Sequence, residues 1–161
     1  LSVETGGIED AEFVYNMLYA RNRANSSKDF VLDIVKSHSP AHCSVFIVTF
    51  NGKKLSGLIV LHFGHYAYMW IGYPGSEAEY LGANEMLMWE VIKWAHSQGY
   101  RTIENTGGDD ISTLQYQRKF NPELKQYFIV NGSSSLFRAY KSIKNLIMPP
   151  RYDLEMYIGS E

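Results

Sequence analysis

The most constraining feature of the chain is a helical stretch between two strand-like segments. One stripe of this stretch carries its main apolar side chains, Ala83, Leu87, Val91, Trp94 and Ala95. Gly99 then acts as a C-cap, and YRTIENT (100–106) fits a strand. A strand, a helix and a strand in this order normally make a right-handed crossover, so we predict that 100–106 runs parallel to 66–71 in one sheet.

The chain before this helix predicts an antiparallel meander. SVFIVTF and KLSGLIVLHF flank Asn51-Gly52, a strong two-residue hairpin signal because both turn positions need positive φ. Gly64 separates the second run from HYAYMWIG. The predicted strands are 44–50, 54–62 and 66–71.

Two short helices are predicted ahead of the meander. Asp10 can cap a helix over AEFVYNMLYAR, where apolar residues recur at helical spacing. Ser26, with Asp29 three residues later, resembles a capping box for KDFVLDIVKS, and Pro40 ends that helix.

The last third of the chain predicts a short helix, DISTLQYQRKF, a strand, KQYFIV, a helix over 136–147 and a last strand, LEMYI. No repeat, linker or low-complexity tract appears. We therefore predict a single α+β domain over 1–161, with a mixed sheet and flanking helices. Because the first residue is Leu1 rather than Met, we also expect that it can be one part of a longer two-domain protein.

Composition narrows the class of protein. The longest apolar runs are far shorter than the roughly 20 residues of a membrane span, so no span is predicted. Cys43 is the single cysteine, which excludes an internal disulfide, and the N-terminus lacks an export-signal pattern. We therefore expect a cytoplasmic protein.

Charge and histidine spacing restrict its ligands. A formal net charge of -2 argues against a protein dedicated to duplex nucleic acid. Seven bases stand against one acid between Tyr116 and Arg151, which is either a solvated surface or an anion-binding face. His62 and His65 point to opposite faces of an extended chain, so no metal site is predicted.

The order of elements resembles the GNAT acyltransferase fold, and residues 8–130 resemble its FemAB-like branch. The resemblance is carried by ANEMLMWEVIKWAHSQGYRTIENTGG and LQYQRKFNPELKQY. Members of that branch show a helix ending in Trp-Ala and then Gly, a strand leading to Asp-x-Gly-Gly, and an aromatic-Lys-x-x-Phe motif. This chain departs from that pattern at Asn105, in place of Asp, and at Gln117, in place of Lys, so the positive charge moves to Arg118 or Lys119.

The resemblance implies an N-acyltransferase whose parallel strands splay between YMWIG and TIENT. Freed backbone N–H groups would polarise the donor carbonyl, and the following helix N-terminus would accept the pyrophosphate. The donor would be acetyl-CoA or another acyl-CoA, with aminoacyl-tRNA less favoured, and the acceptor an amine of a small molecule, a peptide or a cell-envelope precursor. The implied donor-binding residues are Tyr73, Gly75, Ser76, Gly82, Ala83, Asn84, Arg118 and Lys119.

Two side chains are predicted to act at the reaction centre. Tyr116 would protonate the leaving thiolate, and the alternative is an aromatic side chain packed under the sheet. Asn105 would hydrogen-bond a donor or acceptor amide, and the alternative is an Asx interaction that starts the Gly107-Gly108 turn.

A second hypothesis is a non-catalytic binding or scaffold domain that has kept the fold and lost the donor site. The loop YPGSEAEYLGAN keeps two glycines but has no basic residue, and Gln117 replaces the family Lys. Trp89 falls on the polar side of its helix, where it either contacts a further domain or a second subunit in a homodimer, or is a single exposed aromatic residue.

Overall fold

The chain of the computed structural model forms two compact units, residues 1–106 and the residues from 107 onward. Within these units the structure describes residues 1–20, 26–74, 82–105 and 111–125. That residues 1–161 make a single domain stays a prediction. The predicted strand KQYFIV, the predicted helix over 136–147 and the predicted strand LEMYI lie outside the described residues.

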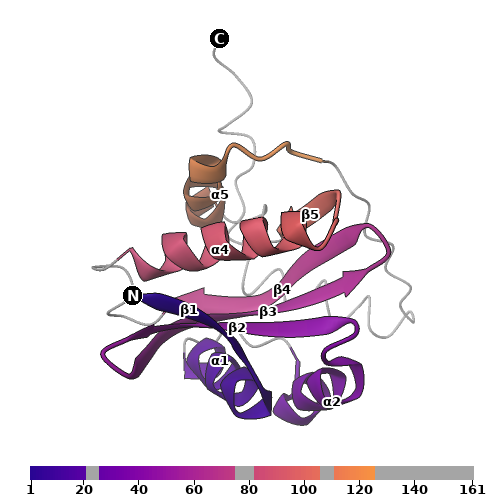
Figure 1. Ribbon diagram of the computed structural model, residues 1–161. Coiled ribbons are helices and arrows are strands. Elements are labelled where there is room, and N and C mark those ends of the chain that lie inside the picture. Colours follow the sequence, from indigo (N-terminus) through magenta and orange to yellow (C-terminus); the bar gives the residue numbers. More distant parts are fainter. Residues whose placement is uncertain (21–25, 75–81, 106–110, 126–161) are drawn as a thin grey trace, which may run out of the picture. The chain divides into compact units, whose positions relative to one another are not determined.

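The first unit is built on a mixed five-stranded sheet (Figure 1). The strands, in the order in which they pair, are β1 (Ser2–Gly6), β2 (Cys43–Phe50), β3 (Lys53–Phe63), β4 (Tyr66–Pro74) and β5 (Thr102–Asn105). The pairs from β1 to β4 are antiparallel, and β4 and β5 are parallel. The predicted α+β class, the meander and the parallel crossover are therefore confirmed.

Strand β1 is a correction, because the sequence predicted two helices as the first elements. The segment SVETG is short and largely polar, and its burial follows no simple alternation. In the sheet it pairs with β2, from Ser2 opposite Thr49 to Gly6 opposite Val45. Pairing of this kind depends on a partner about 40 residues away, so a local pattern does not reveal it.

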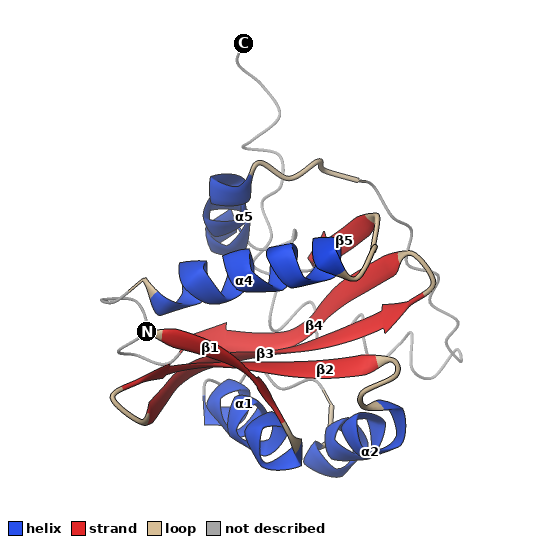
Figure 2. Cartoon of the chain, in the orientation of Figure 1, coloured by secondary structure: helices blue, strands red, loops and turns tan. Residues whose placement is uncertain are grey.

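Helices cover both faces of this sheet (Figure 2). Helices α1 (Ile8–Ala20) and α2 (Lys28–His38) pack on one face, and α4 (Ala83–Ser97) packs on the other. The second unit contributes α5 (Ile111–Gln117) and a 3-10 turn, η1 (Arg118–Phe120), where a short helix was predicted. Among the described residues, no helix has the length and apolar character needed to cross a bilayer.

Helix α1 begins earlier than the sequence predicted, whereas α2 begins at Lys28 as predicted but has a different cap. The Asp10 carboxylate lies inside the first turn of α1 and accepts a hydrogen bond of 2.8 Å from the Gly7 N–H, so α1 starts before Asp10. Ser27, rather than Ser26, caps α2, and its hydroxyl accepts from the Phe30 N–H at 3.3 Å. The capping-box pattern pointed to Ser26, because Asp29 follows it by three residues, whereas the serine directly before the helix is the one used.

The predicted turns are confirmed by the backbone. Asn51 and Gly52 adopt φ values of 50° and 75°, as a two-residue hairpin turn requires. Gly99 follows α4 with a φ of 80°, and the Tyr100 N–H donates to the Ala95 carbonyl. This closure sends the chain from α4 directly into β5.

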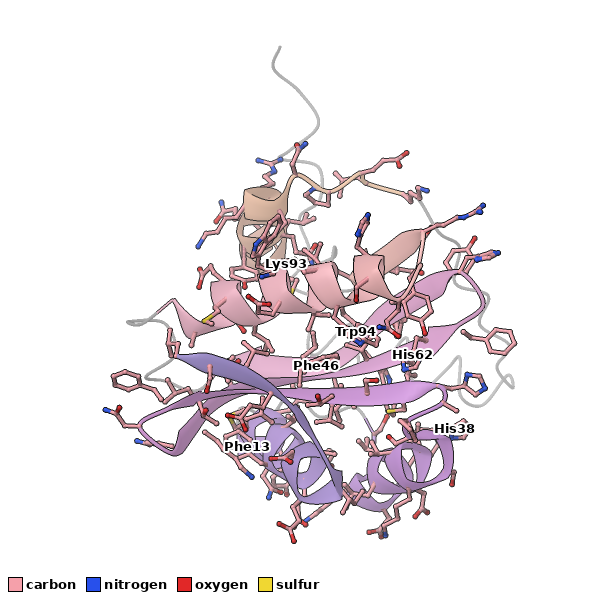
Figure 3. All side chains as sticks on the ribbon, viewed as in Figure 1. Phe13, His38, Phe46, His62, Lys93 and Trp94 are labelled. Carbon is pink, nitrogen blue, oxygen red and sulfur yellow. The ribbon has the colours of Figure 1, made fainter. Side chains whose placement is uncertain are left out.

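A polar cluster fixes the C-terminal end of α4 to the sheet. The side chains of Phe46, His62 and Trp94 lie between the sheet and this helix (Figure 3). His62 is 6% exposed, and both ring nitrogens are engaged, Nε2 with the Ser44 hydroxyl at 3.1 Å and Nδ1 with the Tyr100 hydroxyl at 2.8 Å. Burial, together with the nearby charge of His42, lowers the pKa of His62.

We expect this cluster to make the fold sensitive to acid. The unfolded chain binds a proton at His62 more readily than the folded chain, so the stabilisation is complete above about pH 6.5 and is lost as the pH falls through the lowered pKa. The slope approaches about 1.4 kcal/mol per pH unit for one proton. Urea titrations between pH 7.5 and pH 5 measure it.

His62→Gln is the reference for that experiment, because glutamine can form hydrogen bonds but does not titrate. The variant is expected to lose stability at pH 7.5 and to show a flatter pH dependence between pH 7.5 and pH 5. Carboxylates titrate in both proteins and cancel in the difference. Equal slopes for the two proteins would contradict the assignment.

Candidate active site

Within the described residues, the parallel pairing of β4 with β5 covers the first part of β4. Tyr66 lies opposite Thr102, and the last pair is Met69 opposite Asn105. Strand β4 continues to Pro74. Strand β5 is followed by residues 106–110, which lie outside the described residues, so the splay expected from the sequence stays a prediction.

A β-bulge lies at the same point. Val60 of β3 pairs with Met69 and Ile59 pairs with Ile71, so Trp70 is an extra residue in β4. A bulge bends its strand and increases the local twist. The bend thus begins next to Met69, the residue of β4 that pairs with Asn105.

The N-terminus of α4 lies at the carboxyl end of β4. Gly82 precedes the helix in the left-handed conformation, with a φ of 64°. Asn84 Oδ1 accepts a hydrogen bond of 3.2 Å from the hydroxyl of Ser56, a residue without exposed surface. Ser56 pairs with Pro74, the last residue of β4. One hydrogen bond therefore anchors the start of α4 beside the carboxyl end of β4.

This arrangement suits an anionic ligand. The first N–H groups of a helix have no partner within the helix, and the helix dipole gives its N-terminus partial positive charge. Phosphate groups bind such ends. The donors here are backbone groups, and among the described residues no group of three or more His, Cys, Asp or Glu side chains could hold a metal ion.

The end of β5 presents two polar side chains. Asn105 pairs with Met69, which is buried on the face covered by α4, and Glu104 pairs with Tyr68. Because successive side chains of a strand alternate, Asn105 is placed on the α4 face and Glu104 on the opposite face. Sequence reasoning selected Asn105 and missed Glu104, because YRTIENT alone does not show which face each residue occupies.

The face opposite α4 carries an aromatic pair at the bulge. The rings of Trp70 and Phe30 meet edge to face, with centroids 6.3 Å apart and an interplanar angle of 81°. Phe30 belongs to α2 and is 52% exposed. Neither residue was predicted as part of the site, since the pair depends on the contact of α2 with β4.

The predicted donor-binding residues fall into three groups. In the first unit, Gly82, Ala83 and Asn84 start α4, and Tyr73 pairs with Gly57 near the end of β4. Gly75 and Ser76 lie outside the described residues. Arg118 and Lys119 form part of η1 in the second unit. The grouping of Tyr73 with the start of α4 at one end of β4 is thus present, whereas the roles of all these residues stay predictions.

Tyr116 belongs to the second unit, in the last turn of α5. Its ring meets that of Phe120 edge to face at 5.8 Å, and the Lys119 ammonium lies 5.3 Å from its ring centroid. These contacts lie within the second unit, so both the catalytic role of Tyr116 and its packing under the sheet stay predictions.

The fold is that of an acetyltransferase (GNAT) domain. The family model described as an acetyltransferase (GNAT) domain matches residues 13–118, which is more than half of the chain. The chain belongs to the GNAT acetyltransferase family.

Solved structures share this fold at low sequence identity. The aminoglycoside acetyltransferase AAC(6')-Iy, in complex with a CoA-containing bisubstrate analogue, matches with a TM-score of 0.67 and 12% identity, over 83% of this chain and 97% of that one. The aminoglycoside acetyltransferase meta-AAC0020, from an uncultured soil metagenomic sample and in complex with sisomicin, matches with a TM-score of 0.62 and 14% identity. The match covers 83% of this chain and 95% of that one. A ribosomal-protein-alanine N-acetyltransferase from Brucella melitensis biovar Abortus 2308 matches with a TM-score of 0.65 and 9% identity. The match covers 83% of this chain and 100% of that one. No curated protein matches the sequence.

Proposed function

We propose that this protein is an N-acyltransferase that moves an acyl group, in the first place acetyl, from acyl-CoA to an amine. The observation that carries the proposal is the occurrence of two features in the second half of β4. These are the bulge at Trp70 and, beside Pro74, the start of α4, which the hydrogen bond between Asn84 and Ser56 holds in place. Together they offer backbone donors for a carbonyl and for a pyrophosphate within one site.

In this reaction the amine nitrogen attacks the thioester carbonyl carbon. A C–N bond forms, the C–S bond breaks, the amine proton passes to water or a nearby base, and the CoA thiolate takes up a proton. Unpaired N–H groups of β4 beyond the bulge would stabilise the developing oxyanion. Holding the two reactants in line supplies much of the rate, because effective molarities reach on the order of 10⁵ M or more.

The finer assignments follow from the resemblance and from the relatives. Asn105 would hydrogen-bond a reacting amide, Tyr116 would protonate the thiolate, and Arg118 with Lys119 would face the donor phosphates. A FemAB-like placement within the family, and a cytoplasmic location, are part of the same proposal. The CoA analogue named for one structural neighbour supports acyl-CoA over aminoacyl-tRNA as the donor.

A non-catalytic binding domain is the second candidate. The observation that favours it is the loop before α4, YPGSEAEYLGAN, which contains no basic side chain to pair with phosphate. A measurable transfer of an acyl group to any amine of a test panel would rule out this second candidate.

Asn84→Asp is expected to weaken binding of acetyl-CoA about tenfold, since it puts a negative charge where the pyrophosphate would lie. The aspartate retains an oxygen for the Ser56 hydroxyl, and an acid in the first turn suits the helix dipole, so the fold should be unaffected. Calorimetric titration of wild type and variant with acetyl-CoA measures the change.

The control is Asn16→Asp, the same chemical change on the exposed side of α1. It alters the net charge equally but lies on the helix that covers the other face of the sheet. Absence of heat with wild type at millimolar acetyl-CoA would overturn the acyl-CoA proposal. Equal weakening by both substitutions would overturn the placement of the pyrophosphate at α4.

A further inference from the structure

The two faces of the sheet offer different chemistry at the bulge. On one face, the N-terminus of α4 provides backbone donors for an anion. On the other face, Trp70 meets Phe30 of α2, and Ile71 belongs to the apolar cluster under α1 and α2. Trp70 and Ile71 thus both point away from α4, as the two residues of a bulge can.

This asymmetry separates the donor from the acceptor. A donor whose pyrophosphate rests on the start of α4 reaches the unpaired edge of β4 from the α4 face. An amine that attacks the same carbonyl must then approach from another direction, and the face that carries Trp70 and Phe30 is open to it in part, because Phe30 is 52% exposed. The acceptor would therefore meet aromatic rings before it meets the thioester.

The same face also carries a carboxylate. Glu104 is exposed and pairs with Tyr68, and alternation places both on the side of Trp70. Tyr68 precedes Trp70 by two residues in β4, a step of about 7 Å along a strand. Exposed aromatic rings bind flat apolar groups and the faces of cations, and a carboxylate binds an ammonium group.

We propose that Phe30, Trp70 and Glu104 select the acceptor, and that the acceptor is a primary amine on a flat, apolar body such as an aromatic ring. Phe30 and Trp70 bind the body, and Glu104 binds the ammonium group before it loses its proton. The inference rests on the proposed acyltransferase function, and it names the substrate class of the same site. It also distinguishes this chain from neighbours named for aminoglycosides, which are large polar polycations.

The test compares acceptors of two kinds with acetyl-CoA as donor. The full chain is expected to acetylate 2-phenylethylamine with a kcat/KM at least about tenfold above that for 1,4-butanediamine or for sisomicin. Phe30→Ala should raise KM for 2-phenylethylamine about tenfold, whereas Phe30→Tyr, which keeps a ring, should restore it. Glu104→Gln should raise KM for the same amine by about the same factor.

The control is Phe50→Ala, which removes another exposed phenylalanine, 41% exposed, at the end of β2. It should leave KM for 2-phenylethylamine unchanged. Calorimetry with acetyl-CoA is run on every variant, and Phe30→Ala should bind the donor as wild type does.

The outcomes separate the two claims. If the wild type did not bind acetyl-CoA, the acyltransferase proposal itself would be overturned. Three outcomes would overturn the acceptor inference if the wild type binds acetyl-CoA normally. They are a preference for 1,4-butanediamine or sisomicin, no transfer to any of the three amines, and an unchanged KM in Phe30→Ala. Each of them leaves the acyltransferase proposal standing.

Discussion

Gly57→Val is expected to destabilise the protein by about 3 kcal/mol or more, and Gly57→Ala by about 1–3 kcal/mol. A Cβ atom at this position in β3 would collide with Val14 Cγ2 of α1, and it would lie 2.7 Å from Ile47 Cδ1 and 3.2 Å from the Phe46 carbonyl oxygen. Val14 and Ile47 have 0% and 2% of their surface exposed, so neither can move aside without disturbing the core.

Chemical denaturation monitored by near-ultraviolet circular dichroism measures this cost. Gly7→Ser is the control, because a Cβ at Gly7 has no neighbour within 4 Å and serine is favourable before a helix. Gly72→Ala should be intermediate, since its nearest neighbour, Leu58 Cδ1 at 2.6 Å, is the end of one flexible side chain. A Gly57→Ala protein as stable as Gly7→Ser would show that α1 does not lie as close to β3 as the structure places it.

The parts of the fold that were predictable have strong local signals. Asn51-Gly52 fixes the hairpin because few residues tolerate two consecutive positive φ values. Helix α4 was predictable because its apolar stripe is long and Gly99 ends it. A crossover of this length then leaves parallel pairing as the expected arrangement of β4 and β5.

The parts that were missed depend on partners distant in sequence. SVETG becomes a strand only because β2 pairs with it. The bulge at Trp70 is defined by counting β4 against β3, and HYAYMWIG alone contains no sign of an extra residue. The contact of Phe30 with Trp70 requires α2 to lie across the sheet from α4. A site formed by contacts between elements distant in sequence has no sequence motif of its own.

The start of a helix after the glycine-bearing loop was predictable, whereas the roles of the site residues stay predictions. The glycine-bearing helix start was visible in the sequence, and Asn84 indeed stands at the start of α4. Its contact with Ser56 was not visible, although this hydrogen bond determines where the helix begins relative to β4. The sequence therefore indicated that the N–H groups at the start of α4 are available to a ligand. The register of the sheet was needed to show that these groups lie beside the end of β4.

Deletion of Trp70 is expected to weaken acetyl-CoA binding on the order of 100-fold, because it removes the bulge. Without the extra residue, Met69 and Ile71 become consecutive and keep their partners Val60 and Ile59, so β4 can pair regularly with β3. A straight β4 can extend its pairing with β5, and its N–H groups would then be unavailable to a carbonyl. Calorimetric titration with acetyl-CoA measures the loss.

Trp70→Ala is the matched control, because it removes the ring and keeps the backbone count of β4. Both variants lose the contact with Phe30, so both should be destabilised, by about 3–5 kcal/mol if the ring is well packed. Thermal melts with wild type as reference establish that each variant is folded at the temperature of titration. Only the deletion should abolish donor binding, while Trp70→Ala should keep donor affinity within a few-fold and lose affinity for the acceptor. If the folded deletion variant bound acetyl-CoA as tightly as Trp70→Ala does, the bend in β4 would not be required for binding of the thioester. The donor would then be bound by the anion site at the start of α4 alone.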